Sequence, residues 1–336
     1  MPKTIRNEFD KYLSYEKLME AHKKARKGKG YRNEIIKFNL KQEEYIMWLL
    51  EQLKTQKYKH GGYTTFYVTE PKLRKIEKSR YIDRIVHRWL VDNFLEPAFV
   101  PQFISTSFAC LKNKGMHRSA LYVQNVMKKC KINWGEYYIL KMDVSKYFDN
   151  INKNILLDIL KRKIKDEKLL WLIQEILFSQ NREKGLEIGN YTSQMFANIY
   201  LNEVDQYIKH TLKVQFYCRY LDDSIVIVKT KKEAKKILNK IQVFLRKTLE
   251  LELNKKTQIF KSKQGVNFCG YKINEYRLKI RDKGKRKLKC KIKNLKQKIK
   301  KGKMTSKDAK RLLAGHLGYL KYADVNNLKN KLFYIE

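Results

Sequence analysis

The sequence predicts an α+β protein, in which short β-strands and amphipathic helices share one body. Three observations support this class. Short apolar runs such as Tyr137–Met142 and Ser224–Val228 have the length of strands. Other stretches, such as Lys232–Leu249, repeat their apolar residues at the helical period. The 336 residues are 43% hydrophobic, which provides for a sizeable core and excludes a wholly disordered basic tail.

Apolar periodicity places the elements of the first half of the chain. In order, these are a helix over Gln42–Leu53, β-rich Tyr63–Thr69, a turn at Glu70–Pro71, the segment Leu73–Glu77 and a helix over Asp83–Phe94. Pro97 and Pro101 are expected to break the last of these helices.

The second half begins with the strand Tyr137–Met142, which runs directly into Asp143. Strands Val214–Tyr220 and Ser224–Val228 enclose Leu221-Asp222-Asp223, so a hairpin with acids at its tip is expected. The remaining expected elements are helices near Lys153–Leu160 and over Leu169–Phe178, Tyr191–Ile208 and Lys232–Leu249, a Lys-rich segment over Lys279–Lys303, and an apolar stretch over Leu312–Tyr322.

The charge of the chain indicates a polyanionic partner. Lys and Arg number 75 against 34 Asp and Glu, which gives a net charge of +41. Nucleic acid is the natural partner for such a surplus. Genome bias alone explains a Lys-rich composition but not the low content of acids. Membrane binding is not expected, because the basic residues are spread along the chain and no apolar run approaches the ~18 residues of a span. A cytoplasmic location follows as an expectation, and the five cysteines show no metal-binding or disulfide spacing.

Three aspartates stand where apolar residues are expected. Asp143 ends a strand of buried character, and Asp222 and Asp223 lie between two strands rich in Tyr, Ile and Val. Asp is also an ordinary turn residue, so the pair alone is ambiguous. Together with Asp143, the pair suits Mg²⁺, which prefers hard oxygen ligands. Two such ions support in-line phosphoryl transfer.

At these residues the sequence resembles the reverse transcriptases. Tyr220-Leu221-Asp222-Asp223 matches their YxDD box, and Asp143-Val-Ser-Lys-Tyr-Phe148 resembles their first palm motif. Further segments resemble family motifs in the expected order, namely Leu73-Arg74-Lys-Ile, Asp83-Arg84-Ile-Val, Ser107 to His117, Gly185 to Gln194, Leu253 to Thr257, Phe268-Cys-Gly270-Tyr and Gly315 to Asp324.

The resemblance implies a right-hand polymerase with fingers, palm and a small helical thumb, the palm being an antiparallel sheet backed by helices. The implied domains are fingers with an N-terminal basic segment over 1–136, a palm over 137–275 with fingers elements around 165–190, and a Lys-rich thumb over 276–336. The implied activity is RNA-directed DNA synthesis with two Mg²⁺ ions, for which Mn²⁺ can substitute.

Within the family, Ile188-Gly189 and Ser193-Gln194 resemble the diversity-generating retroelement enzymes, where many other members carry Gln-Gly and Ser-Pro. An error-prone enzyme of such an element is the leading interpretation. An antiphage-defence reverse transcriptase working on its own non-coding RNA is a second interpretation. A catalytically silent RNA-binding protein is a third interpretation. Such a protein is expected to have lost one or more of the three aspartates, and here all three are present.

By resemblance, Asp143 and Asp222 bind both metals with Asp223 assisting, and Tyr220, Gly189 and Gln194 contact the nucleotide. Lys256, or Lys255 in its place, protonates the departing pyrophosphate.

Three further positions carry two readings each. Phe148 excludes a ribose 2′-hydroxyl, or is a core aromatic. Arg74 grips the triphosphate, or is one more exposed base. Ile188 lacks the polar contact that Gln supplies and so loosens base selection, or is a packing residue.

The resemblance also implies partners. These are an RNA template, an RNA–DNA duplex and dNTPs, together with a structured non-coding RNA and an accessory protein. The Lys-rich segment Lys279–Lys303 either follows a nucleic-acid backbone or forms a solvated helix face.

Overall fold

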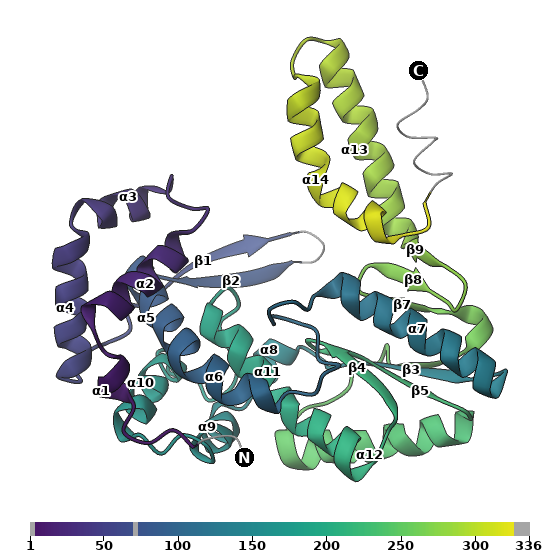
Figure 1. Ribbon diagram of the computed structural model, residues 1–336, viewed down its shortest axis with the longest axis horizontal. Helices are drawn as coiled ribbons and strands as arrows, with labels where there is room; N and C mark the ends of the chain where they lie inside the picture. Colours follow the sequence, from purple (N-terminus) through teal and green to yellow (C-terminus); the bar gives the residue numbers. More distant parts are fainter. Residues whose placement is uncertain (1–3, 70–72, 326–336) are drawn as a thin grey trace. The chain divides into compact units, whose positions relative to one another are not determined.

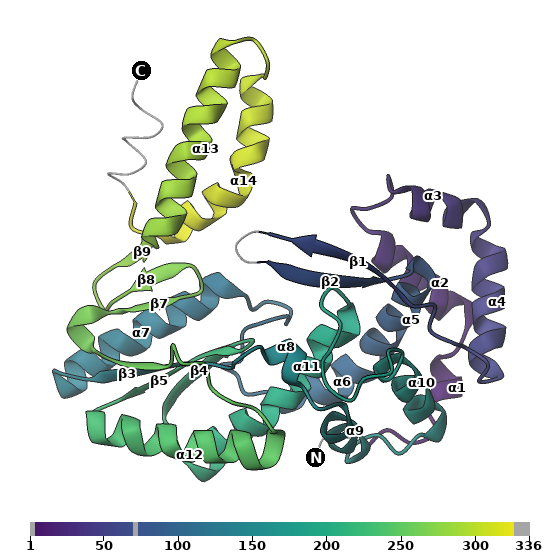
Figure 2. The same ribbon diagram turned by 180° about the vertical axis from the view of Figure 1, so that it is seen from behind.

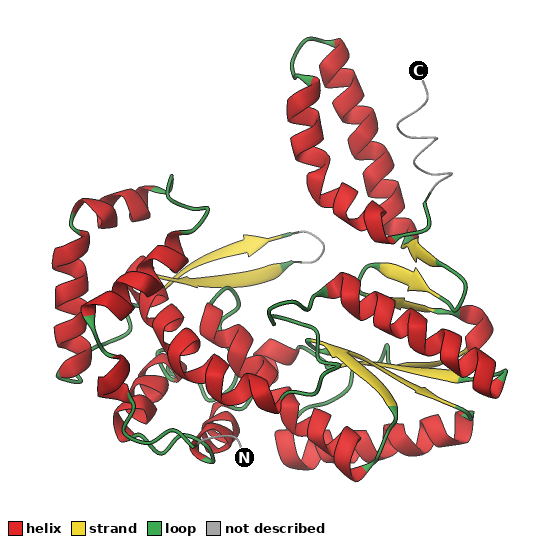
Figure 3. Ribbon diagram, viewed as in Figure 1, coloured by secondary structure: helices red, strands yellow, loops and turns green. Residues whose placement is uncertain are grey.

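The computed structural model describes residues 4–69 and 73–325 (Figure 1). The chain divides into two compact units, each assembled from separate segments. The first comprises Met1–Ile104, Val144–Tyr207 and Gln242–Glu252, and the second comprises Ser105–Asp143, Ile208–Ile241 and Leu253–Glu336. Helices occur with antiparallel sheets throughout, so the predicted α+β class is confirmed (Figure 3). The expected division at 136/137 and 275/276 stays a prediction.

The first unit opens with four helices, α1 (Phe9–Tyr12), α2 (Tyr15–Arg26), α3 (Asn33–Leu40) and α4 (Gln42–Lys54). Helix α4 confirms the helix expected from Gln42. It buries Ile46, Leu49 and Leu53, which recur at helical spacing. The Ser14 side chain accepts a hydrogen bond from the Lys17 backbone N–H and so caps α2.

A two-stranded antiparallel hairpin follows, made of β1 (Tyr63–Val68) and β2 (Arg74–Ser79). The turn expected at Glu70–Pro71 lies outside the described residues. The chain then continues through α5 (Tyr81–Leu90), a π-helical turn η1 (Val91–Leu95), α6 (Glu96–Phe99) and a 3₁₀ turn η2 (Val100–Gln102).

The expected break at Pro97 and Pro101 is wrong. Pro97 stands at the start of α6 and Pro101 at the start of η2. The backbone at Leu95, Glu96, Phe99 and Val100 is right-handed helical, so the helical run continues past Pro97 to Gln102 as a succession of π, α and 3₁₀ turns.

The rest of the first unit contains α8 (Tyr147–Asn150), α9 (Lys153–Lys161), α10 (Glu167–Leu177) and α11 (Tyr191–Gln206), followed by the π-helical η3 (Tyr207–Thr211), which runs into the second unit. Asn152 and Asp166 cap α9 and α10 by accepting backbone hydrogen bonds. Helix α11 is buried around most of its circumference, which marks it as a central helix of this unit.

The second unit is built on a four-stranded antiparallel sheet of order β4-β5-β3-β6. Its strands are β3 (Tyr138–Asp143), β4 (Phe216–Tyr220), β5 (Asp223–Val228) and β6 (Gln258–Lys261). Helix α7 (Met116–Trp134), which the sequence analysis did not predict, lies on one face. The first part of α12 (Lys231–Leu249) lies on the other (Figure 2). Met127 and Cys130 of α7 pack in one core with Ile139 and Ile225 of the sheet.

After β6 come a 3₁₀ turn η4 (Ser262–Gln264) and a small antiparallel sheet of β7 (Val266–Phe268), β8 (Tyr271–Ile273) and β9 (Leu278–Ile280). Two helices follow, α13 (Asp282–Lys300) and α14 (Ser306–Tyr322). Leu288, Ile292 and Leu295 of α13 form an apolar stripe that packs against α14, with most of the α13 lysines exposed. Among residues 4–69 and 73–325, no helix combines the length and apolar character needed to cross a membrane.

Candidate active site

The β4–β5 hairpin carries two of the three aspartates. Leu221 and Asp222 form the connection between the strands, and Tyr220 pairs with Asp223 at their ends. Leu221 has a φ of +53°, a left-handed conformation that favours glycine at the first position of a two-residue hairpin loop. Ile225 to Val228 are buried, so the apolar part of β5 anchors the half-buried tip. The hairpin with acids at its tip is therefore present as expected.

The third aspartate lies directly across the sheet. Strand β3 pairs antiparallel with β5, and in this register Asp143 is the partner of Asp223. Directly opposed residues of antiparallel strands have Cα atoms about 4.5 to 5.5 Å apart. Asp143 and Asp223, 80 positions apart in the chain, are thus neighbours, and Asp222 is adjacent to Asp223 in the connection.

A lysine that the sequence analysis missed lies beside these acids. Lys141 Nζ is 3.1 Å from Asp223 Oδ1, with the two side chains 20% and 31% exposed. Lys141 stands two residues before Asp143 on β3, so both side chains leave the same face of the sheet. The sequence signal that could have identified Lys141 as a site residue was its charge inside the otherwise apolar run YYILKM.

A buried arginine on β4 is hydrogen-bonded to the hairpin connection. Arg219 on β4 is 2% exposed, and its Nη1 donates to the Leu221 carbonyl at 3.2 Å. Its backbone N–H donates to Thr106, and its carbonyl accepts from Phe108. The segment around Ser107, which resembles a family motif, thus pairs with the edge of β4 next to the tip.

The loop that carries Lys256 also contacts this site. The Asn254 backbone N–H donates to the Asp143 carbonyl at 2.6 Å, and Asn254 Oδ1 accepts from the Lys256 backbone N–H. Lys256 and Lys255 are both exposed, so the structure leaves either available for the expected role.

The donor set at this place has the chemistry that Mg²⁺ requires. Asp143 on β3, Asp223 on β5 and Asp222 in the β4–β5 connection supply carboxylate oxygens. In the described part of the chain, however, no three acidic, His or Cys side chains are grouped closely enough to form a metal site as they stand. The Asp223 carboxylate is instead paired with Lys141.

The remaining candidates belong to the first unit, where the structure brings several of them together. The Leu186 backbone N–H donates to the Phe148 carbonyl at 2.8 Å, which joins α8 to the segment before Ile188. The Glu77 N–H donates to the Ile188 carbonyl at 3.0 Å, which joins that segment to β2. Gly189 has a φ of +121°, and a Cβ there would lie 3.0 Å from Ile76 Cγ2, so only glycine fits without strain.

Arg74 and Gln194 are exposed in the same unit. Arg74 begins β2, where it pairs with Val68 at the end of the β1–β2 hairpin, and Gln194 stands in the first turn of α11. The three aspartates, Tyr220 and Lys256 belong to the second unit.

A charged network that the sequence analysis missed surrounds Ile188. Arg182 Nη2 lies 2.8 Å from Glu77 Oε2 and 3.2 Å from Glu187 Oε1, and Lys153 Nζ lies 3.5 Å from Glu187 Oε1. Burial acts to raise the pKa of Glu77, but hydrogen bonds from Lys75, Arg182 and Gln180 outweigh it and lower the pKa to about 2. Burial lowers the pKa of Lys153, which the Glu187 carboxylate partly opposes.

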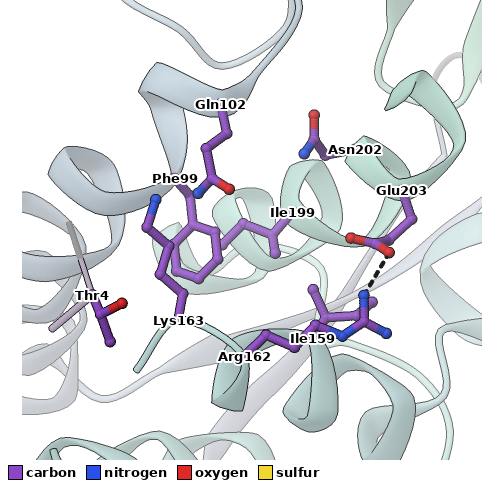
Figure 4. Close-up of a pocket in the computed structure, with 9 residues that line it drawn as sticks. All are labelled: Thr4, Phe99, Gln102, Ile159, Arg162, Lys163, Ile199, Asn202 and Glu203. Atoms are coloured by element: carbon purple, nitrogen blue, oxygen red, sulfur yellow. Dashed lines mark hydrogen bonds and ion pairs between the residues drawn. The ribbon is translucent and has the colours of Figure 1, made fainter. Parts of the chain in front are cut away.

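The first unit also contains a separate pocket of about 220 Å³. Figure 4 shows Lys163, Gln102, Asn202 and the Arg162–Glu203 ion pair around an apolar floor of Phe99, Ile159 and Ile199. Lys163 Nζ and Gln102 Nε2 both donate to the Ala98 carbonyl, and Asn202 Oδ1 accepts from Gln206. Because these polar groups already have hydrogen-bond or ion-pair partners within the protein, we interpret the pocket as structural.

Comparison with protein-family models matches residues 58–273 to the reverse transcriptase (RNA-dependent DNA polymerase) family. The match covers more than half of the chain and includes all three aspartates, Asp143, Asp222 and Asp223. The chain belongs to this family.

Relatives with curated descriptions are similar over part of their length. Protein YkfC of Escherichia coli (strain K12) is 26% identical over 243 residues, covering 60% of this chain and 63% of YkfC. The group II intron-encoded protein LtrA of Lactococcus lactis subsp. cremoris is 23% identical over 306 residues, covering 69% of this chain and 50% of LtrA. The chain thus spans about half to five eighths of these two proteins.

Among solved structures, the telomerase of Candida tropicalis in complex with a TWJ fragment of telomeric RNA is similar with a TM-score of 0.51. The identity is 16%, and the match covers 76% of this chain and 52% of the telomerase. With the helices and antiparallel sheets described above, the family match and this likeness confirm the expected right-hand polymerase fold.

Proposed function

We propose that the chain is an RNA-directed DNA polymerase, which copies an RNA template into cDNA by nucleotidyl transfer. The observation that carries the proposal is the strand register that opposes Asp143 to Asp223 and sets Asp222 beside them. These carboxylates form an acidic focus in a chain of net charge +41. Membership of the reverse transcriptase family supports the same activity.

Each proposed catalytic residue has a definite task. Asp143 and Asp222, assisted by Asp223, would hold two Mg²⁺ ions, which when bound stabilise the attacking and departing oxygens of the transfer. Lys141 neutralises Asp223 and so limits the repulsion among three carboxylates. Lys256, with Lys255 as the alternative, supplies a proton to the departing pyrophosphate. Tyr220 contacts the incoming nucleotide at the hairpin.

The nucleotide is proposed to contact the first unit. Arg74 binds the triphosphate through its planar guanidinium, and Phe148 excludes a 2′-hydroxyl. Ile188, Gly189 and Gln194 border the base and sugar. Ile188 is half-buried, its carbonyl accepts a hydrogen bond from the Glu77 N–H, and Gly189 follows it. This placement supports a short apolar wall beside the nucleotide.

The biological role that we propose is that of a diversity-generating retroelement. Ile188-Gly189 and Ser193-Gln194 support it, because an aliphatic side chain at 188 offers no hydrogen bond to orient the nucleotide. Such an enzyme would copy a template repeat with errors, together with a structured RNA and an accessory protein. An antiphage-defence role is the alternative. Sequencing the flanking DNA tests the choice, because a diversity-generating element requires paired template and variable repeats there.

The exposed lysines of α13 are proposed to contact the nucleic-acid backbone. Their apolar counterparts Leu288, Ile292 and Leu295 face α14, so the charged side of the helix faces solvent. Contacts of this kind are independent of sequence and weaken as salt is raised.

Primer extension on an RNA template with dNTPs and Mg²⁺ tests the polymerase proposal. Asp222→Asn is expected to abolish extension while RNA binding persists, because the amide keeps its size and loses the charge that holds a cation. Asp158→Asn, an exposed aspartate on α9, is the matched control and is expected to extend normally. Chelation by EDTA should stop wild-type extension, and excess Mg²⁺ should restore it. Full extension by Asp222→Asn would refute the assignment.

A further inference from the structure

The segment 186–190 is hydrogen-bonded to β2 through the Ile188 backbone and the Asn190 side chain. Strand β1 pairs with β2 along the hairpin. On the side facing the segment, the Glu77 N–H donates to the Ile188 carbonyl, and the Glu77 carbonyl accepts from Asn190 Nδ2 at 3.1 Å. The Ser79 N–H donates to Asn190 Oδ1 at 3.1 Å. Three backbone groups of β2 are therefore satisfied by two residues of this segment.

Asn190 is the centre of this contact. Its side chain is buried, with the residue 2% exposed, and both ends of the carboxamide are used. Oδ1 accepts from the Ser79 N–H and the Ser79 hydroxyl, and Nδ2 donates to the carbonyls of Glu77 and, at 3.5 Å, Glu187. A carboxamide has two donors and one acceptor oxygen, so Asn190 uses its full capacity here. Neither Asp nor Ser can reproduce this set.

The charged network joins β2 to the segment 186–190 at the same place. Arg182 bridges Glu77 on β2 and Glu187 on the segment, and Gln180 Nε2 donates to Glu77 Oε1 at 3.2 Å. Glu77 and Glu187 are each less than a tenth exposed. The ion pairs thus lie on one side of Ile188, and Gly189, whose φ is +121°, follows it.

Strand β2 also carries Arg74. Arg74 lies three residues before Glu77 on the same strand, which at about 3.3 Å per residue is about 10 Å away. The proposed triphosphate ligand and the proposed wall of the nucleotide site are therefore joined through one strand. Asn190 is the buried side chain that connects the two next to Gly189.

We propose that Asn190 is a positioning residue that sets the affinity for the incoming nucleotide by locking Ile188 to the strand that bears Arg74. The inference rests on the proposed polymerase function. One nucleotide touches Arg74 and Ile188 together only when their separation is fixed. Loss of the Asn190 contacts frees the segment to turn about Gly189, so the nucleotide is bound less tightly, while the metal-binding aspartates on β3 and the β4–β5 hairpin are unchanged.

The test compares steady-state kinetics of primer extension for wild type, Asn190→Ala, Asn190→Ser and Ser79→Ala. Asn190→Ala is expected to raise the KM for dNTP about tenfold, with kcat changed less than about threefold, because misplacement affects binding of the nucleotide before chemistry. Ser79→Ala keeps its backbone donor and loses one hydroxyl, so an increase of about threefold is expected. Asn190→Ser is expected to lie between the two.

Asn274→Ala is the matched control. Asn274 Oδ1 accepts from the backbone N–H groups of Tyr276 and Arg277 in the turn between β8 and β9, so its loss also removes two hydrogen bonds from an asparagine. Its KM for dNTP is expected to equal that of wild type. Template RNA binding is measured for every variant and is expected to stay constant.

The outcomes separate the possibilities. An unchanged KM in a folded Asn190→Ala overturns the inference. A lower Tm with a reduced active fraction but an unchanged KM assigns Asn190 a merely structural role and also overturns it. If Asn190→Ala does not fold, Ser79→Ala and Asn190→Ser decide by the same criterion. Absence of extension by wild type instead refutes the proposed function, before any variant is compared.

Discussion

Replacement of Glu77 by Gln is expected to lower the free energy of unfolding. The loss relative to wild type is expected to be larger at pH 7 than at pH 3. Glu77 is buried on β2 and accepts hydrogen bonds from Lys75, Arg182 and Gln180. Although burial opposes it, these donors lower the pKa of Glu77 from 4.5 to about 2. A carboxyl whose pKa is lower in the folded state contributes stability above its unfolded pKa. That contribution is lost as the pH falls through the folded value.

The size of the effect follows from the two pKa values. A fall from 4.5 to about 2 corresponds to about 3 kcal/mol of folding stability at pH 7. At pH 3 the unfolded carboxyl is already protonated, and the contribution falls to about 1 kcal/mol. Lys75 is half-exposed, so solvent screens its share and the values are upper limits.

Equilibrium unfolding in urea, followed by tryptophan fluorescence, measures this difference. Three of the four tryptophans, Trp48, Trp89 and Trp171, belong to the first unit, which also contains Glu77, so the signal reports mainly on that unit. Wild type and Glu77→Gln are compared at pH 7 and pH 3. Glu43→Gln, an exposed glutamate on α4, serves as the control for loss of one negative charge.

Two results would contradict this reasoning. If Glu77→Gln lowers the free energy of unfolding equally at pH 7 and pH 3, the carboxylate charge is not what stabilises the unit. If Glu43→Gln has the same effect as Glu77→Gln, the effect belongs to net charge and not to the network around Arg182.

Three further variants test the site. Phe148→Ala is expected to raise the ratio of ribonucleotide to deoxyribonucleotide incorporation about tenfold or more, and an unchanged ratio would reject the proposed exclusion of the 2′-hydroxyl. Ile188→Gln is expected to reduce misincorporation about fivefold by restoring one oriented polar contact, and identical error spectra from sequenced cDNA would discard this explanation. Lys141→Met is expected to lower the half-saturating Mg²⁺ concentration about fivefold, because a partly exposed cation worth about 1 kcal/mol no longer competes for Asp223. The exposed Lys229→Met is its control, and an equal shift in both variants would reduce the effect to overall charge.

The elements with a clear period were predictable from sequence. The strand ending at Asp143 and the hairpin around Asp222 follow from apolar runs that stop at acids, and both are present. The pairing of Asp143 with Asp223 was expected only as convergence, because strand register depends on contacts 80 residues apart. Helix α7 was missed although Ala120, Val123, Met127 and Cys130 recur at helical spacing, because the face that it buries also includes the polar residues Ser119 and Gln124.

Buried polar contacts were the part that the sequence did not disclose. Arg182 and Glu187 lie after α10 in a segment without apolar periodicity, so the sequence predicts only a loop there. Their partners Glu77 and Lys153 come from β2 and α9, so the network exists only once three distant segments meet. Lys141 escaped notice for a related reason, since one charge in an apolar strand gains meaning only from the carboxylate across the sheet.

Because Leu221 has a positive φ, a change at this position is expected to affect the melting temperature and the rate of polymerisation in opposite ways. A bulky residue in the left-handed region costs about 1 to 2 kcal/mol, which glycine would largely remove. The same glycine would let the peptide carrying Asp222 sample many orientations in place of one. Leu221→Gly is therefore expected to melt at a higher temperature and to polymerise more slowly, so heat resistance and catalytic speed move in opposite directions at this turn.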